Sequence, residues 1–159
     1  MIFVTLGSQR FQFNRLLKKI DECVADGTIS DEVFAQIGVS DYIPQHYIYK
    51  SFLDRNEFAC TISKCDTVIT HGGTGAIIGA VKKRKKVIAV PRLARYGEHV
   101  DDHQIQLIRQ FDGLNLICPC WDVEDLKAAI QTSKMEQYQE YESNSNIIIE
   151  SIVQFIENN

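Results

Sequence analysis

Apolar residues recur along the chain in short runs of four to six positions. These runs lack the regular polar alternation of half-exposed strands and stop at glycine, proline or polar residues, which is typical of parallel strands buried on both faces. The runs predict strands at Ile2–Leu6, Val33–Ile37, Tyr47–Phe52, Thr67–Thr70, Val87–Val90 and Leu114–Ile117.

Between these runs, apolar residues recur at helical spacing. The clearest such segment extends from Phe13 to Val24, with charged residues on its other face, and ends at Asp26-Gly27. Further helices are predicted around Glu57–Lys64, Gly75–Val81, Asp102–Arg109 and Val123–Gln131. Strands and helices largely alternate, which favours an α/β fold: a single Rossmann-like, doubly wound parallel sheet joined by right-handed crossovers.

Length and charge limit the kind of protein this can be. The 159 residues are enough for one hydrophobic core, so residues 1–159 are expected to form a single domain. Apolar residues make up 45% and charged residues 24%, as in soluble globular domains, which excludes a disordered or fibrous chain. With 17 basic and 21 acidic residues the net charge is −4, and we expect no nucleic-acid partner.

Neither a membrane span nor a secretory signal is indicated. The longest uncharged apolar stretch near the middle, Gly75–Val81, is far shorter than the roughly 18–20 residues that a spanning helix needs. Met1–Leu6 reads as a strand and lacks the basic segment of a signal peptide, so we expect a cytoplasmic protein. Five cysteines without Cys-x-x-Cys spacing predict buried, reduced thiols.

The most informative motif is a glycine turn between a predicted strand and a predicted helix. Thr67–Thr70 is followed by His71-Gly72-Gly73-Thr74-Gly75. Glycines let backbone approach a diphosphate, and free amides at a helix N-terminus attract it. The turn matches neither a Walker loop nor the Gly-x-Gly-x-x-Gly fingerprint. The alternatives are tight packing without a ligand and, for His71 alone, a loop-anchoring role.

A polar loop, Pro91–Gln104, follows the next predicted strand and leads into a helix. Its carboxylates and amides suit sugar hydroxyls, and it leaves the sheet at the same edge as the glycine turn. His99 and His103, spaced i, i+4 beside Asp102, are an alternative metal pair, but we expect no metal. A solvated surface turn is the simplest alternative.

Two further segments allow more than one interpretation. Lys82–Lys86 is a basic block that suits a solvated helix end or contact with anionic lipid. Residues 137–159 begin polar and then become apolar, which predicts a C-terminal helix that packs back on the domain or docks on a partner chain. The candidate docking residues are Ile148, Ile149, Ile152 and Ile156.

Three ordered motifs resemble the C-terminal, nucleotide-sugar-binding half of family 28 glycosyltransferases of the GT-B fold. They are Phe3–Ser8, Cys65–Gly75, and Val90–Arg92 together with Glu98–Gln104. In length the chain resembles the small subunits of split enzymes, such as the two-part UDP-N-acetylglucosamine transferase of dolichol-linked oligosaccharide synthesis. Pro91-Arg92 and Gly97-Glu98-His99 resemble the bacterial subunits that build exopolysaccharide and capsule.

The resemblance implies a role for each motif. Gly7 and Ser8 would face the interdomain cleft. The glycine turn, with Gly72, Gly73, Thr74, Gly75 and the preceding His71, would hold the diphosphate of a UDP-sugar. Ribose or donor sugar would face Glu98, Asp102, His103 and Gln104. Many relatives carry a ribose-binding glutamate where this chain has Gly79, so that contact is in doubt.

By the same resemblance, the chain would take part in an inverting hexosyl transfer from a UDP-sugar to a lipid-linked acceptor. No cofactor or metal is expected, and the general base would lie on a membrane-associated partner subunit that binds the acceptor and recruits this chain to the cytoplasmic membrane face. One alternative is a non-catalytic nucleotide-sugar-binding or scaffold subunit. Another is a hydrolase or epimerase acting on nucleotide sugars.

Overall fold

Six parallel strands form one sheet in the computed structural model, which describes residues 1–142. Their order across the sheet is β3-β2-β1-β4-β5-β6, and every neighbouring pair is parallel. This confirms the predicted doubly wound α/β fold. The strands are β1 (Ile2–Thr5), β2 (Val33–Gln36), β3 (Ile48–Lys50), β4 (Thr67–His71), β5 (Lys86–Val90) and β6 (Cys118–Pro119).

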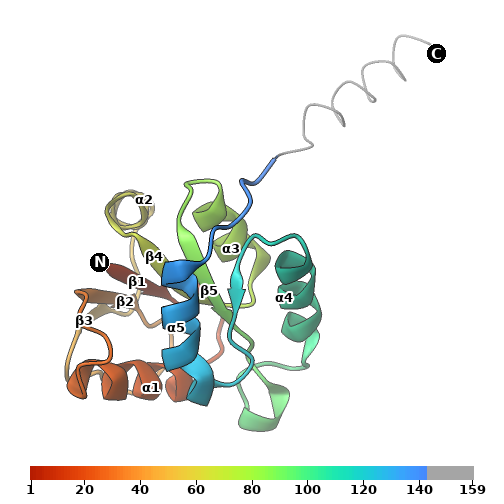
Figure 1. The fold of residues 1–159 in the computed structure, drawn as a ribbon. Helices are drawn as coiled ribbons and strands as arrows, with labels where there is room; N and C mark the ends of the chain where they lie inside the picture. Colours follow the sequence, from red (N-terminus) through yellow and green to blue (C-terminus); the bar gives the residue numbers. More distant parts are fainter. Residues whose placement is uncertain (143–159) are drawn as a thin grey trace, which may run out of the picture.

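Helices cover both faces of the sheet (Figure 1). One core includes Val4 of β1 and side chains of α1 and α5. The other includes Phe3 and side chains of α2, α3 and α4, because successive residues of a strand point to opposite faces. The helices are α1 (Asn14–Ala25), α2 (Arg55–Lys64), α3 (Thr74–Val81), α4 (His103–Gly113) and α5 (Leu126–Met135), with short 3-10 turns η1 (Ala94–Tyr96) and η2 (Val123–Asp125).

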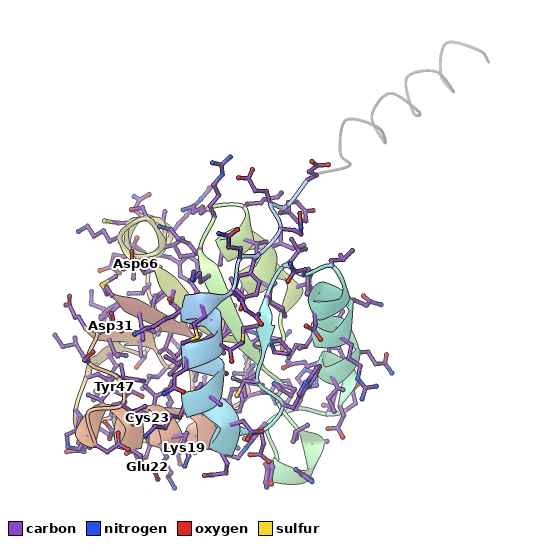
Figure 2. All side chains as sticks on the ribbon, viewed as in Figure 1. Lys19, Glu22, Cys23, Asp31, Tyr47 and Asp66 are labelled. Carbon is purple, nitrogen blue, oxygen red and sulfur yellow. The ribbon has the colours of Figure 1, made fainter. Side chains whose placement is uncertain are left out.

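Local sequence explains several helix boundaries. Asp54 and Glu57 form a capping box at the start of α2, in which each side chain accepts the backbone N–H of the other residue. Helix α1 buries Leu16 and Ile20 on its inner face. On its outer side Lys19 pairs with Glu22 and reaches Glu124 of η2, which ties α1 to the start of α5 (Figure 2).

The strand predicted at Leu114–Ile117 is wrong: the observed strand, β6, begins four residues later, at Cys118. Helix α4 continues to Gly113, and Asn115 turns the chain with a φ of 52°. Leu116 and Ile117 are apolar because they pack in the core, but the pairing with β5 begins only at Cys118. The helix predicted at Val123–Gln131 begins as η2 and continues as α5 to Met135.

Most of the basic block binds carbonyl oxygens of the protein. Lys83 Nζ donates to the carbonyl of Ala59 in α2. Lys85 Nζ donates to the carbonyls of Ser63 and Cys65 at the end of α2, and Lys86 Nζ donates to the carbonyl of Lys134 at the end of α5. These contacts favour the helix-end interpretation of the block.

The C-terminal prediction is only partly covered by the structure. Residues 137–142 form no helix, and Gln139 N–H donates to the carbonyl of Asn115. Ile148, Ile149, Ile152 and Ile156 lie outside the described residues. Within residues 1–142, no helix has both the length and the apolar character needed to cross a bilayer.

Candidate functional site

The direction of the crossover connections reverses between β1 and β4, which lie side by side at the centre of the sheet. In open parallel sheets, ligands bind outside the carboxyl ends of the strands at this switch point. Thr5 pairs with Thr70 in register, so both strands end at one level. The loop after β1, the glycine turn after β4 and the polar loop after β5 therefore meet at one edge, as the sequence predicts.

The imidazole of His71 lies between the first two loops. A Cβ atom at Gly7 would lie 2.7 Å from His71 Cε1, and one at Gly73 would lie 2.3 Å from His71 Nε2. Gly7 also has a φ of 72°, which favours glycine. Burial, helped by the charge of Arg92, lowers the pKa of His71 to about 4. The imidazole between these two loops is therefore neutral at pH 7.

The glycines of the turn serve two different purposes. A Cβ at Gly72 would lie 2.7 Å from Gln104 Cβ, so the glycine at this position allows α4 to approach the turn. The glycine at position 73 allows the His71 ring to lie against the backbone of the turn. At Gly75, by contrast, a Cβ would meet no atom of another segment within 4 Å among residues 1–142. Among the three glycines of the turn, only Gly75 leaves open space of the kind that a bound ligand would fill.

The backbone amides of the turn divide in the same way. Gly72 N–H donates to Gln104 Oε1 at 3.1 Å, and Gly73 N–H donates to the carbonyl of His71 at 2.8 Å. Thr74 and Gly75 are the first two residues of α3, and their amides donate to no group within residues 1–142. Both residues are exposed. The structure thus narrows the predicted phosphate cradle to two amides at the positive end of a helix dipole.

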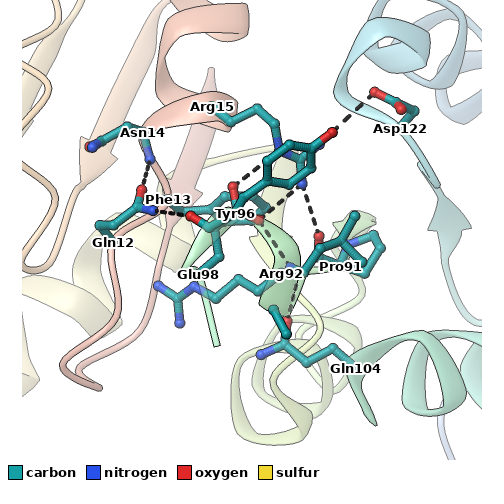
Figure 3. A network of polar contacts seen from close by, with 12 residues as sticks. Gln12, Phe13, Asn14, Arg15, Pro91, Arg92, Tyr96, Glu98, Gln104 and Asp122 are labelled. Carbon is teal, nitrogen blue, oxygen red and sulfur yellow. Dashed lines mark hydrogen bonds and ion pairs between the residues drawn. The ribbon is translucent and has the colours of Figure 1, made fainter. Parts of the chain in front are cut away.

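The side chain of Gln104 joins the glycine turn to the polar loop, and Figure 3 shows it beside Arg92 of that loop. Its Oε1 accepts the amide of Gly72 at 3.1 Å and the amide of Arg92 at 3.0 Å. The side chain is buried. In this structure Gln104, which the resemblance assigns to ribose or sugar, holds the glycine turn and the polar loop together.

Arg92 extends from the end of β5 beneath the loop after β1 and is 1% exposed. Its Nη2 donates to the carbonyl of Leu6 at 2.8 Å and to that of Phe11 at 3.0 Å, and its guanidinium lies over the Phe13 ring. Burial lowers its pKa to about 10, so the group remains charged at pH 7. Arg92 was not among the predicted site residues, because nothing in the local sequence indicates that an arginine after a strand is buried.

Glu98 is also directed into the protein. Its carboxylate accepts Arg15 Nε and Nη2 of α1, each at 3.0 Å, and Leu93 N–H at 3.0 Å (Figure 3). The Glu98 side chain is 1% exposed, and such bidentate pairs are geometrically specific. Glu98 therefore fixes the polar loop on α1, and Arg15 is a second residue whose contribution no local pattern indicated.

The remaining predicted residues are exposed, in the polar loop and in the loop after β1. Asp102 Oδ1 accepts the amide of Ala94 at 2.7 Å. The imidazoles of His99 and His103 both face the carboxylate of Asp101 rather than that of Asp102. Ser8 is exposed in the loop after β1. The structure thus brings Gly7, His71 and Gly73 together at the ends of β1 and β4. It places His103 with a different carboxylate from the one that its sequence spacing indicated.

The fold and this edge of the sheet identify the family. The model of the glycosyltransferase family 28 C-terminal domain matches residues 1–158. The chain belongs to glycosyltransferase family 28, as its C-terminal domain. No curated protein sequence gives a significant match.

Solved structures of low identity share the fold of this family 28 domain. The glycotransferase of kitacinnamycin matches with a TM-score of 0.63 and 17% identity over 85% of this chain, which covers 35% of that protein. SnogD from Streptomyces nogalater matches with a TM-score of 0.53 and 18% identity, over 83% of this chain and 36% of its own. The chain therefore spans about a third of the length of these glycosyltransferases.

One similar structure has nearly the same length as this chain. The solution structure of ALG13 matches with a TM-score of 0.62 and 19% identity, over 95% of this chain and 93% of that one. The fold of this chain therefore also occurs in a solved structure of nearly the same length.

Proposed function

We propose that this chain is the UDP-sugar-binding subunit of an inverting hexosyltransferase. It presents the donor to a lipid-linked acceptor in exopolysaccharide or capsule biosynthesis, together with a membrane-associated partner subunit that binds the acceptor. The observation that carries the proposal is the pair of amides of Thr74 and Gly75, which bond to no group of the described chain, at the start of α3 and at the switch point of a family 28 domain.

These amides suit the chemistry of the transfer. When a UDP leaving group departs, negative charge grows on its β-phosphate, and fixed N–H donors at a helix N-terminus stabilise that charge without rearranging. Loss of one such preorganised donor in other enzymes costs about 2.7–4 kcal/mol of activation free energy. The exposed Thr74 hydroxyl is a further donor, and Gly7 and Ser8 lie in the loop after β1 at the same edge of the sheet. The transfer uses no cofactor and no metal in this proposal.

The acceptor side of the site belongs to the partner subunit. The chain corresponds to about a third of the complete glycosyltransferases that share its fold. Thr74 and Gly75 lie on an exposed edge that a second domain would cover. The general base is assigned to that partner, which also brings this cytoplasmic chain to the membrane, so the chain alone has little transferase activity.

Titration of the purified chain with UDP tests the donor role. We expect saturable heat for the unmodified chain and for Gly113→Val, and at least a tenfold loss of affinity for Gly75→Val. Both glycines are helical and have open surroundings, but Gly113 ends α4 at the opposite edge of the sheet. Gly73→Val is unsuitable, because its Cβ would clash with His71 whether or not UDP binds. Equal affinity of all three proteins for UDP would refute the proposal.

A non-catalytic nucleotide-sugar-binding or scaffold subunit is the alternative, and Gly79 favours it because relatives place a ribose-binding glutamate there. The two functions predict different effects of Gly75→Val on sugar transfer by the assembled pair of subunits. If Gly75→Val abolishes sugar transfer while the pair remains associated, the chain takes part in catalysis. If transfer is unchanged, the chain is a scaffold.

A further inference from the structure

A group of three metal-ligating side chains lies on the polar loop between η1 and α4. The ligand atoms of His99, Asp101 and His103 all lie within 4.8 Å of one another. We propose that these three residues bind a divalent transition-metal ion of the zinc type. The site is separate from the proposed phosphate-binding amides, and the sugar transfer is not assigned to it.

One side of the group is rigid and the other is open. The His99 side chain is only 8% exposed, and its ring lies 4.6 Å from the Phe11 ring, centroid to centroid. The ring of His103 meets that of His99 edge-on at 4.7 Å. Asp101 and His103 are 58% and 45% exposed. An ion therefore has a path from solvent, and a coordination position remains for water.

The polar contacts of His99 leave room for a cation. Asp101 N–H donates to the lone pair of His99 Nδ1, but at 3.5 Å this hydrogen bond is long and weak, so a metal ion at that nitrogen has little to displace. Asp101 Oδ1 lies 3.4 Å from the same nitrogen. Two atoms that both carry lone pairs repel each other at this distance unless a proton or a metal ion lies between them. His103 Nδ1 also faces Asp101 Oδ1, so three potential ligands converge on one point.

The ligand set selects the class of ion. Two imidazoles and one carboxylate suit zinc, cobalt or nickel, whereas magnesium and calcium prefer oxygen ligands. With bonds of about 2.0–2.2 Å, ligands around a tetrahedral ion lie roughly 3.4 Å apart. The separation of His99 Nδ1 and Asp101 Oδ1 is 3.4 Å. His103 is closer to the carboxylate than this and has to swing outward, which its exposure allows.

Two features set the strength of the site. All three ligands come from five consecutive residues, so metal binding has to order only one short segment, and the entropic cost is small. Against this, His103 is the first residue of α4, where the helix dipole opposes a cation, and the charge of Asp101 offsets that effect. The sequence spacing placed the carboxylate of Asp102 beside the two histidines. In the structure its Oδ1 accepts the amide of Ala94, so Asp102 is not assigned as a ligand.

The test is a titration of the full chain with Zn²⁺ alone at pH 7.5, in a Cys60→Ser background that removes the exposed thiol. We expect one equivalent to bind. His99→Ala, Asp101→Asn and His103→Ala should each weaken binding at least tenfold, since even loss of a residue that only supports a ligand costs 10–100-fold. Binding should also be weaker at pH 5.5, because protons compete for imidazole nitrogens.

His46→Ala is the matched control. His46 Nδ1 also faces a carboxylate, that of Asp21 at 3.2 Å, but no second imidazole of residues 1–142 joins them in a group of three ligands. This variant should bind Zn²⁺ like the parent. Replacement of Zn²⁺ by Co²⁺ should give the visible absorption of a four-coordinate ion in the parent and in this control, but not in the ligand variants. Absence of stoichiometric binding, or binding that survives the three ligand substitutions, would overturn the proposal in favour of a proton shared by the histidines and Asp101.

Asp101→Asn separates this site from the donor site. Asp101 is exposed, so the variant should fold, as its circular dichroism would show. It should lose Zn²⁺ binding and retain the UDP affinity of the parent within about twofold. A chain that binds Zn²⁺ but not UDP would refute the donor role alone, and the reverse result would refute the metal site alone.

Discussion

At the scale of single residues, the ring of His71 fills the space between the loop after β1 and the glycine turn. Its ring occupies the space that side chains at Gly7 and Gly73 would fill. The hydroxyl of its neighbour Thr70 donates to the carbonyl of Thr5 across the two central strands. A neutral ring contributes no positive charge to this edge, so in the proposed function the attraction for a diphosphate comes from the backbone amides of Thr74 and Gly75.

The buried imidazole makes the stability of the protein depend on pH. The pKa of His71 falls from 6.5 to about 4 on folding, because burial disfavours the charged form. Between these values the unfolded chain binds more protons than the folded one, so stability is complete above about pH 6.5 and decreases as the pH falls toward 4. The loss is on the order of 3 kcal/mol. Urea unfolding at pH 7 and pH 5 should show a smaller difference for His71→Gln, and an equal difference would contradict this account.

At the scale of elements, α3 exposes its first two residues while Ile77 and Ala80 pack in the core. A Cβ atom at Gly79 would meet no atom of another segment within 4 Å among residues 1–142. The same helix that offers two amides thus has an open position one turn later. The resemblance to family 28 implies that many relatives carry at this position a glutamate that holds the ribose hydroxyls.

Gly79→Glu is therefore expected to strengthen UDP binding. Hydrogen bonds to a charged group contribute about 1.5–3 kcal/mol, which corresponds to roughly a 10- to 100-fold gain in affinity. Gly79→Ala is the control, because it stabilises the helix without adding a carboxylate. Calorimetry with UDP would compare the three proteins. An equal gain in both variants would show that helix stability, and not ribose recognition, is responsible.

At the scale of the whole molecule, buried polar side chains join loops that are far apart in the sequence. Arg15 of α1 binds Glu98 of the polar loop, 83 residues away. Arg92, after β5, binds the carbonyls of Leu6 and Phe11 in the loop after β1. These contacts hold the edge of the sheet in one arrangement before any ligand arrives.

Removal of one partner should show how much this arrangement depends on the pair. Glu98→Ala leaves the Arg15 guanidinium without its carboxylate, and we expect a loss of about 3–5 kcal/mol in the free energy of unfolding. Glu140→Ala removes an exposed ion pair with Arg84 and should cost less than about 1 kcal/mol. Urea denaturation measures both. Equal costs would mean that the Arg15–Glu98 pair has no structural importance.

The alternation of elements and the location of the glycine turn could be predicted because they depend on local patterns of apolar residues and glycines. The strand at Leu114–Ile117 could not, since apolar residues that pack in the core look the same whether or not they pair with a strand. The contacts of Gln104, Arg92 and Arg15 join distant segments and leave no local pattern. The role of Gly73 was likewise hidden, because its neighbour is the ring of His71 and not a ligand.

The single oxygen of Gln104 that accepts two amides makes the segments after β4 and β5 depend on one side chain. Loss of this oxygen would remove the acceptor of the Gly72 amide and that of the Arg92 amide at once, and a buried amide without an acceptor is unfavourable. A substitution at Gln104 therefore disturbs the glycine turn and the polar loop together, although they lie about 20 residues apart in the sequence.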